Sequence, residues 1–415
     1  MPRPHGQGRR PGGRGAAPAE ARGLDVGQGP EPDRRRALLE DHQRAWRDAA
    51  LEAPAGEGPL GDRELHPHAQ EVGPPARAAD APPGAAPGGA PGPGASPPCR
   101  RLATVDLGSN TVRLLVVEVP PTGPWRIVDQ DQQVTRLGEG LAASGVIAPE
   151  PGERTAAVVA AYVRRAEDAG AETVRIVATS AVRTAANGPA FAAALAQRTG
   201  YAVEVVSGEE EARLTVLGIL QGLAPAPEPM VAFDVGGGST EVVLARAGRV
   251  VAAQSLALGV VPLAERYPFP GPVEAPRWDA LRAEVRARLT RELIPAVRSA
   301  GVAALVGTAG TVTTLAALDL GLEAYDARRV HGHRLGRAAL ARLRARLGAL
   351  TLAERAALPC LEPGRADLIV PGLAIVEAVL EVTGAHEVLT SDWGLREGVV
   401  ADTLARAPGR AARRA

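Results

Sequence analysis

The sequence predicts an α/β protein built from two similar halves that face each other across a cleft. From residue 101 onward, short apolar runs typical of strands alternate with longer segments of helical periodicity. In addition, one design occurs twice, roughly 130 residues apart, at residues 102–117 and 231–244. Each copy has an apolar run that ends in Asp, a turn of small residues and a second apolar run. Such a repetition indicates two half-domains of similar structure.

Length and composition agree with two domains and exclude several classes of protein. The 415 residues are enough for two sizeable cores. The 47 basic and 47 acidic residues cancel, so no overall field would attract nucleic acid or a membrane surface. No run reaches the ~18 uninterrupted apolar residues of a membrane helix. The two cysteines, Cys99 and Cys360, form neither a disulfide framework nor a zinc site, and the N-terminus lacks the apolar core of a secretory signal. We therefore expect a cytoplasmic protein with no nucleic-acid or membrane partner.

The N-terminal segment differs in composition from the rest of the chain. Residues 1–98 hold 18 of the 37 prolines and 17 of the 48 glycines, with Trp46 as their single aromatic residue. Such a segment cannot bury enough apolar surface to offset the entropy of ordering it. We expect a disordered tail over 1–99, a first domain over 100–224, a second domain over 225–407 whose last helix packs back on the first, and a frayed end over 408–415.

The first half reads as a sheet with helices in between. A hairpin at 102–117 is followed by a third strand with alternating polarity and by a turn at 135–141. The periodicity and the punctuating glycines then predict, in order, a helix at 151–169, a strand at 173–178, a helix from Asn187 or Gly188 to Arg198, and a strand at 201–206. Ser207 with Glu210 forms a Ser-x-x-Glu capping box, which opens the next helix.

The second half repeats this alternation. It starts at Val231 with the second hairpin, and a strand at 249–256 follows. Periodicity predicts helices at 278–299, 336–347 and 367–382, then a short strand at 387–390 and a last helix after residues 392–400. A third turn of small residues, 306–312, follows an apolar run.

The two hairpin turns have the features of a phosphate site. Bare glycine backbone lets N–H groups approach an anion closely and point at it. Asp106 precedes the first turn, and Asp234 and Glu241 flank the second. Carboxylates beside a phosphate cradle need a cation between them, and an all-oxygen set suits Mg²⁺, with Mn²⁺ as the alternative. The competing interpretation is a pair of plain glycine turns with ordinary strand-end carboxylates.

Three further stretches make the pattern specific: residues 177–188, residues 206–213 and residues 255–261. The hairpin pair resembles the ribonuclease-H-like superfamily of actin, Hsp70 and the acetate and sugar kinases. With the three stretches, the region from about 101 to about 405 resembles the exopolyphosphatase and guanosine pentaphosphate phosphatase (Ppx/GppA) family, in its short form without a C-terminal helical domain. The resemblance implies two actin-like domains around a cleft.

The resemblance also assigns roles to individual residues. Glu209 and Glu211 are both left unexplained by the capping box, and the family motif implies that Glu211 is the general base. Asp234 and Glu241 would act with it in catalysis, and Asp106, Asp234 and Glu241 would hold the metal. The phosphate would be bound by Gly108, Ser109, Asn110, Arg183, Gly236, Gly237, Gly238, Ser239, Gly307, Thr308 and Gly310. Asn187 either fixes the loop after Arg183 or caps the following helix.

The function expected on this basis is Mg²⁺-dependent hydrolysis of the terminal phosphate of inorganic polyphosphate. The alternative within the family is removal of the 5′ γ-phosphate of guanosine pentaphosphate (pppGpp), and the short form favours shorter chains or the nucleotide. An alternative from another class is a non-catalytic sensor of polyphosphate or pppGpp. An actin-type ATPase or sugar kinase is a further alternative, although the sequence gives no clear signal for an adenosine pocket. A homodimer is also expected from the family, with Ala- and Leu-rich helices as its surface.

Overall fold

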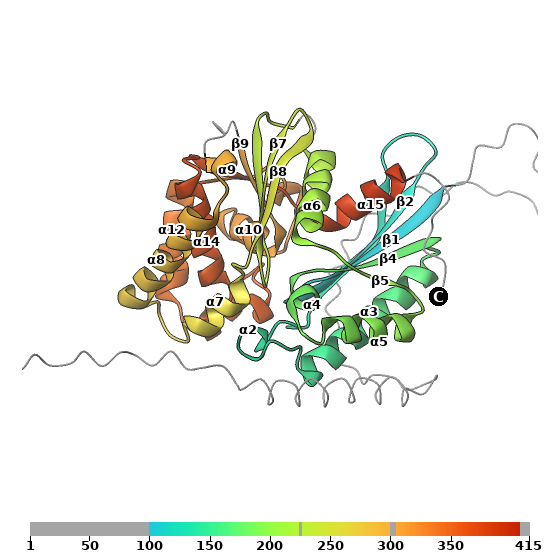
Figure 1. The fold of residues 1–415 in the computed structure, drawn as a ribbon. Helices are drawn as coiled ribbons and strands as arrows, with labels where there is room; N and C mark the ends of the chain where they lie inside the picture. Colours follow the sequence, from blue (N-terminus) through green and yellow to red (C-terminus); the bar gives the residue numbers. More distant parts are fainter. Residues whose placement is uncertain (1–98, 224–225, 299–303, 407–415) are drawn as a thin grey trace, which may run out of the picture. The chain divides into compact units, whose positions relative to one another are not determined.

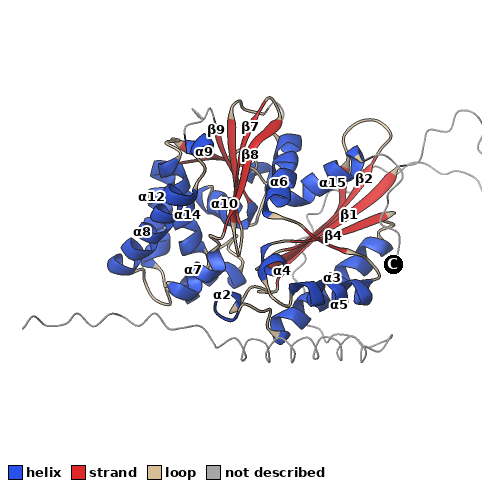
Figure 2. Cartoon of the chain, in the orientation of Figure 1, coloured by secondary structure: helices blue, strands red, loops and turns tan. Residues whose placement is uncertain are grey.

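The computed structural model describes residues 99–223, 226–298 and 304–406, in which two mixed β-sheets are each covered by helices (Figures 1 and 2). Apart from Cys99, the expected N-terminal tail lies outside the described residues, and so does the expected frayed end at 408–415. In these described ranges, no helix combines the length and apolarity needed to cross a membrane.

The first sheet is built on the first predicted hairpin. Its strand order is β3-β2-β1-β4-β5, in which β1 pairs antiparallel with β2 and parallel with β4. The strands are β1 (Arg100–Leu107), β2 (Thr111–Val119), β3 (Arg126–Val134), β4 (Thr173–Ala178) and β5 (Val203–Val205).

The second sheet has the same plan with one strand added at its edge. Its order is β10-β11-β9-β6-β7-β8, so β8-β7-β6-β9-β11 matches β3-β2-β1-β4-β5 in both order and strand direction. The strands are β6 (Met230–Val235), β7 (Thr240–Arg246), β8 (Arg249–Leu256), β9 (Ala304–Thr308), β10 (Arg334–Gly336) and β11 (Glu387–Thr390). This correspondence confirms the prediction of an α/β fold with two similar halves.

Helices pack on both sides of each sheet. On one side of the first sheet lie α3 (Pro149–Asp168) and α5 (Gly188–Thr199). Helices that share a core with one face of the second sheet are α8 (Ala275–Glu292), α10 (Ala309–Asp319), α12 (Arg337–Ala349) and α14 (Ile369–Val382). The opposite faces belong to two helices that cross each other, α6 (Gly208–Gly222) and α15 (Leu395–Ala405).

The alternation of side chains along the strands decides which residues face α6 and α15. In β1, Val105 joins the core with α3, whereas Leu102 joins a cluster with Val400 of α15. In β6, Phe233 faces the α8 and α14 core, whereas Ala232 packs with α6. Because successive side chains point to opposite faces of a sheet, every second residue shares the face of α6 and α15.

The crossing of α6 and α15 is made by glycines. A methyl group on Gly398 would lie 1.8 Å from the backbone oxygen of Leu214, and one on Gly218 would lie 1.9 Å from the backbone oxygen of Gly394. Since backbone atoms would have to move, only glycine fits. Ion pairs also hold α15, because Asp402 accepts from Arg175 Nη1 at 2.9 Å and from Arg213 Nη2 at 2.7 Å.

We therefore expect Gly398→Ala to destabilise the protein by about 3 kcal/mol, the upper range for overpacking a tight contact. The measurement is urea unfolding followed by circular dichroism. Gly336→Ala is the matched control, since a methyl group there would meet no atom within 4 Å. Equal unfolding midpoints for the two variants would contradict the close packing of the two helices.

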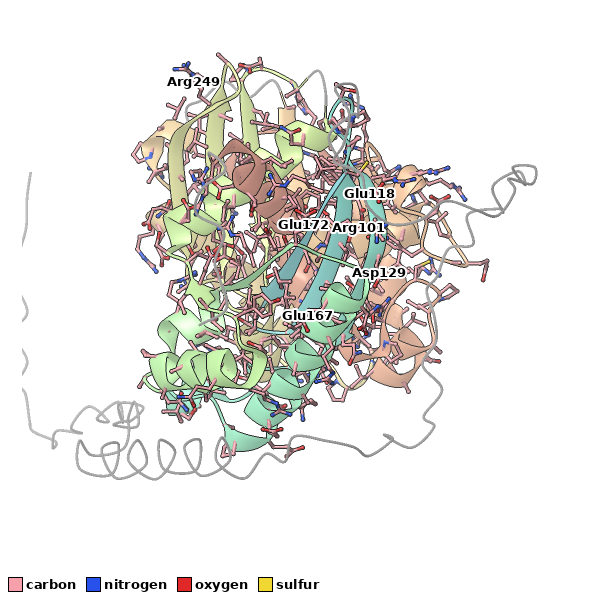
Figure 3. The ribbon with its side chains drawn as sticks, turned by 90° about the vertical axis from the view of Figure 1, so that its right-hand side faces the viewer. Arg101, Glu118, Asp129, Glu167, Glu172 and Arg249 are labelled. Atoms are coloured by element: carbon pink, nitrogen blue, oxygen red, sulfur yellow. The ribbon has the colours of Figure 1, made fainter. Side chains whose placement is uncertain are left out.

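Charged hydrogen bonds hold the strands of the first hairpin together at the end that lies far from its turn. Glu118 accepts from Arg101 Nε at 3.0 Å and from Arg126 Nε at 3.0 Å, which ties the three neighbouring strands together. Figure 3 shows Arg101 and Glu118 next to each other on adjacent strands. The hairpin is therefore anchored at this end, while its turn reaches the opposite end of the sheet.

One expected helix is divided into two in the structure. The helix expected over 278–299 starts at Ala275 and ends at Glu292, because Pro295 cannot continue it, and α9 (Pro295–Arg298) follows. The third turn, predicted to follow an apolar run, is formed by the end of β9 and the start of α10. The remaining helices are α2 (Leu141–Ser144), α4 (Ser180–Thr184), α7 (Val260–Arg266), α11 (Ala327–Val330), α13 (Leu352–Ala356) and the 3₁₀ turn η1 (Pro363–Arg365).

Candidate active site

Four carboxylates come together where the two hairpin turns meet the start of α6. Asp106 lies on the same face of β1 as Leu102, and Asp234 lies on the same face of β6 as Ala232, so both share the face of α6 and α15. Glu241 is the direct partner of Asp234 across the β6–β7 pair. Glu211 belongs to the first turn of α6. The hairpin registers and the helix start thus bring these acids to one place.

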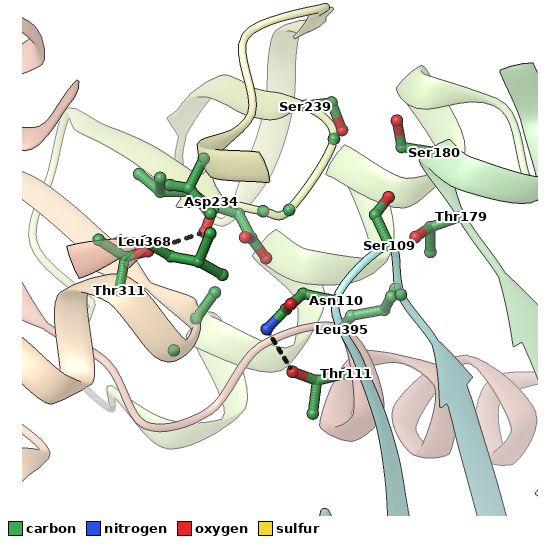
Figure 4. A pocket seen from close by; sticks show the side chains of 18 of the residues that line it. Ser109, Asn110, Thr111, Thr179, Ser180, Asp234, Ser239, Thr311, Leu368 and Leu395 are labelled. Carbon is green, nitrogen blue, oxygen red and sulfur yellow. Dashed lines mark hydrogen bonds between the residues drawn. The ribbon is translucent and has the colours of Figure 1, made fainter. Parts of the chain in front are cut away.

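A cleft that is open to solvent lies at this place, and Asp234 is one of the residues that line it (Figure 4). The figure shows the hydroxyl groups of Ser109, Ser180 and Ser239 gathered at one end of the cleft. Asp106, Glu211 and Asp234 line it together with residues of both turns, which are Gly108, Ser109, Asn110, Gly236, Gly237, Gly238 and Ser239. The two turns therefore line a single cavity, and they lie against each other, because a methyl group on Gly238 would be 2.7 Å from Ser109 Oγ.

The turns expose backbone donors to the cleft. Gly108 N–H donates to Thr111 O at 3.1 Å, and Gly236 N–H donates to Ser239 O at 2.9 Å, so the same bond closes both hairpins. Within the described chain, the N–H groups of Asn110, Gly237 and other residues at the tips have no acceptor. Unpaired amides on a bare backbone form an anion cradle.

The second turn is held from behind by the start of α7. Val260 N–H donates to Gly236 O at 3.1 Å, and Val261 N–H donates to Gly237 O at 2.9 Å. A methyl group on Gly259 would lie 2.3 Å from Gly237 O, so only glycine allows this approach. Because its carbonyls are bound from behind, the turn keeps its N–H groups toward the cleft.

Glu211 is a buried carboxylate in an ion pair. Its Oε2 accepts from Arg183 Nη1 at 2.7 Å, and the same Nη1 donates to Val206 O at 3.0 Å. Burial, and next the charge of Glu241, raise the pKa of Glu211 well above the usual value, while Arg183 acts in the opposite direction. A carboxylate with a raised pKa that lines a cleft is suited to take a proton from water.

Asp234 and Glu241 form an acidic pair on which the positive charges of Arg113 and Arg183 act in the opposite direction to burial. Burial, followed by the charge of Glu241, raises the pKa of Asp234 to about 7. Glu241 Oε1 accepts from Ser239 Oγ and Ser255 Oγ, both at 2.7 Å, but within the described residues its buried Oε2 has no hydrogen-bond partner. A buried carboxylate oxygen without a partner is costly, and a cation would satisfy it.

The residues of this site fit a hard divalent cation that takes part of its coordination shell from water and a bound phosphate. Across the described ranges, no three carboxylate, imidazole or thiolate groups are arranged to hold a metal on their own. Mg²⁺ typically uses one or two protein carboxylates and takes its other ligands from water and substrate phosphates. Asp234 and Glu241 therefore fit as the carboxylates, and Asp106, whose pKa is raised by burial, is the third acid at this site.

Ser255 offers a test of this assignment. Its hydroxyl orients Glu241, and the start of α6 packs on it, because a methyl group on Gly208 would lie 2.3 Å from Ser255 Cβ. We expect Ser255→Ala to weaken Mn²⁺ binding about tenfold, the usual effect of losing a group that orients a metal ligand. Electron paramagnetic resonance titration of Mn²⁺ measures this, with Ser144→Ala as the control. Unchanged Mn²⁺ affinity would remove Glu241 from the metal site.

The structure adds two cleft residues that the sequence analysis did not single out. Arg113 faces the cleft from β2, directly across the strand pair from Asp106, and Arg365 enters from η1. The Arg365 side chain is 11% exposed, and burial followed by the charge of Arg113 lowers its pKa to about 10. The hairpin register could have identified Arg113. No local pattern marks Arg365, which reaches the cleft only through the tertiary fold.

Some predicted phosphate ligands lie elsewhere. Arg183 is absent from the cleft lining and contacts Glu211 instead. Gly307 and Thr308 are also absent from the lining: Gly307 packs against Phe233, and Thr308 Oγ1 donates to Trp393 O at 3.0 Å. Gly310 does line the cleft, where its missing side chain leaves room for the Arg365 guanidinium.

Asn187 fixes a loop and does not cap α5. Its Oδ1 accepts from Ile147 N–H at 2.8 Å, its Nδ2 donates to Ile147 O at 2.9 Å, and it makes no side-chain cap on the helix. Ser207 caps α6 as predicted, by accepting from Glu210 N–H at 3.2 Å. The Glu210 carboxylate pairs with Arg213.

Comparison of the sequence with known proteins identifies one family. The model of the Ppx/GppA phosphatase family matches residues 115–407. Exopolyphosphatase 2 of Mycobacterium tuberculosis is 37% identical over 314 residues, which cover 72% of this chain and 97% of the relative. Exopolyphosphatase 1 of the same organism is 29% identical over 300 residues, covering 72% of this chain and 87% of the relative.

Solved structures show the same fold. The crystal structure of the Aquifex aeolicus member of the Ppx/GppA protein family superposes with a TM-score of 0.64 at 30% identity, covering 75% of this chain and 100% of that one. The crystal structure of an exopolyphosphatase from Cytophaga hutchinsonii superposes with a TM-score of 0.68 at 24% identity, covering 74% of this chain and 98% of that one. At this level of identity the match supports the fold alone.

Proposed function

The chain belongs to the Ppx/GppA phosphatase family, and we propose that it hydrolyses the terminal phosphoanhydride bond of inorganic polyphosphate with release of orthophosphate. One observation carries the proposal: Glu211 and Asp234 line a single cleft together with two glycine-containing turns, whose tip N–H groups at Asn110 and Gly237 have no acceptor within the described residues. That arrangement supplies a base, a metal ligand and an anion cradle within one cavity.

Each group has a role in the reaction. Asn110, Gly237 and the other turn amides, together with the hydroxyls of Ser109 and Ser239, hold the terminal phosphoryl group. Asp234 and Glu241 would hold Mg²⁺, which when bound neutralises charge that builds up on phosphate oxygens. Positioning and electrostatics of this kind supply most of the acceleration in phosphoryl transfer.

Glu211 directs the attack. It accepts a proton from water as the water oxygen bonds to the terminal phosphorus, and the bond from that phosphorus to the bridging oxygen breaks. The products are orthophosphate and a chain shorter by one phosphate. Arg113 and Arg365, the two guanidinium groups of the cleft, offset the negative charge of the departing chain. Arg183 keeps Glu211 in place through their 2.7 Å contact.

The test is a comparison of substrates. Orthophosphate release with Mg²⁺ should be measured from tripolyphosphate, long-chain polyphosphate, pppGpp and ATP, with the wild-type chain and Glu241→Ala. We expect release from polyphosphate that is lost in the variant. Preference for pppGpp would make the nucleotide the substrate, turnover of ATP alone would indicate an ATPase or kinase, and binding without turnover would indicate a sensor.

A further inference from the structure

The segment that follows β3, residues 135–140, is attached to the first phosphate turn. Thr135 N–H and Arg136 N–H both donate to Asn110 O, at 2.9 and 3.0 Å, and Gly138 N–H donates to Ser109 O at 2.7 Å. Three backbone bonds to two consecutive residues of the turn make the segment and the turn a single unit. Any force on the segment is therefore transmitted to the phosphate cradle.

Arg136 extends from this segment to the other half of the protein. Its Nη1 donates to Asp367 Oδ2 at 2.9 Å, and its Nη2 donates to Asp367 Oδ1 at 2.8 Å and to Gly364 O at 3.0 Å. This is a two-pronged contact with a carboxylate, the geometry that only the planar guanidinium provides. Arg136 also has a φ of 53°, a left-handed conformation that disfavours residues with a Cβ.

The contacted turn carries the cleft arginine. Gly364 and Asp367 flank Arg365 in the chain, and Arg365 crosses in the opposite direction, where its Nη2 donates to Thr111 Oγ1 at 3.1 Å and to Gln132 Oε1 at 3.4 Å. Arg136 and Arg365 therefore bridge the two halves reciprocally at one end of the cleft. At the other end of the 135–140 segment, Gly140 N–H donates to Glu265 Oε1 of α7 at 2.8 Å.

A surface ion pair between flexible side chains would contribute little. The Arg136 contact differs in three ways. The side chains of Arg136 and Asp367 are each only 32% exposed. The backbone oxygen of Gly364 is a third acceptor for the guanidinium. In addition, the backbone of Arg136 adopts the disfavoured left-handed conformation. Such a conformation persists only where surrounding contacts determine it.

We propose that Arg136 is a positioning residue that closes the two halves over the cleft and, by holding the 362–367 turn, places Arg365 against the phosphate site. The inference rests on the proposed function for its substrate, because the group that Arg365 would meet is a polyphosphate chain. Arg136 itself does not line the cleft, so it acts through Arg365 and the Asn110 turn. Breaking its contact lowers the fraction of protein in the closed, binding-competent form.

The kinetic test compares Arg136→Ala with Arg165→Ala, which removes an arginine whose ion pairs, with Asp129 and Asp131, stay within the first half. We expect Arg136→Ala to raise KM for tripolyphosphate about tenfold, with kcat changed about twofold or less. Arg165→Ala should leave both at wild-type values. The double variant Arg136→Asp with Asp367→Arg should recover most of the loss seen in each single charge reversal. Unchanged KM in Arg136→Ala, or a fall in kcat alone, would overturn the proposal.

A second measurement does not depend on activity. Ala143 and Ala338 are both exposed and lie one in each half. Nitroxide labels attached after Ala143→Cys and Ala338→Cys, in a Cys99→Ser, Cys360→Ser background, report the distance between the halves by pulsed electron paramagnetic resonance. We expect one narrow distribution in the otherwise wild-type chain and a broad one with Arg136→Ala. Identical narrow distributions would overturn the closing role even if polyphosphate is not the substrate. If the distance distribution broadens in Arg136→Ala but the protein has no phosphatase activity, only the proposed function is overturned.

Discussion

Replacing Glu211 by glutamine is expected to lower kcat by roughly 10²–10⁴-fold, the usual contribution of a general base. The amide keeps the shape of the side chain, and its oxygen can still accept from Arg183, whose Nη1 is 2.7 Å from Glu211 Oε2. What it loses is the ability to take a proton from water. KM should change little, because the phosphate cradle is made by other residues.

The matched control is Glu209→Gln. The two glutamates belong to the same first turn of α6, and the sequence leaves both as candidates, but Glu209 is exposed and Glu211 lines the cleft. Initial rates of orthophosphate release from tripolyphosphate, with saturating Mg²⁺, distinguish them. A large loss in Glu209→Gln together with wild-type rates in Glu211→Gln would transfer the role of base to the exposed residue.

The hairpins were predictable because their determinants are local. An apolar run, a terminal Asp and a glycine turn define a hairpin within about fifteen residues, and the period of two then fixes the face of Asp106, Asp234 and Glu241. The Ser207 cap likewise located the start of α6, and with it Glu211, although Glu210 binds Arg213 and does not complete a capping box. Repetition of the hairpin indicated the second sheet and the cleft between the two turns.

The remaining features depend on contacts between distant segments. Arg365 reaches the first hairpin, 254 positions away along the chain, and no local pattern in residues 362–367 indicates this. Arg183 was expected on phosphate because its stretch resembles the phosphate-binding loop of the family, and no local pattern indicated that it also contacts Glu211. The third turn was predicted only as small residues after an apolar run, and nothing local indicated that it continues directly into α10.

Asp234→Asn is expected to separate metal binding from folding. Asn keeps the size of the side chain but removes the charge, so we expect kcat to fall by about 10²–10³-fold, the loss typical of removing one electrostatic contact to a phosphoryl transition state. Mn²⁺ affinity should fall at least about tenfold. Both follow because Asp234 and Glu241 are direct partners across β6 and β7, and a cation between them needs both charges.

The same substitution should stabilise the metal-free protein. Without a cation the two carboxylates repel each other, and Glu241 Oε2 has no hydrogen-bond partner in the described part of the chain. Removing one charge is expected to raise the free energy of unfolding by about 1–2 kcal/mol in chelator-containing buffer. Thermal unfolding with and without Mg²⁺ measures this, and Asp279→Asn on the exposed side of α8 is the control. If the metal-free Asp234→Asn protein melts at a lower temperature than the wild type, contacts within the protein already stabilise the two carboxylates. The charge repulsion that supports the proposed cation site would then be absent.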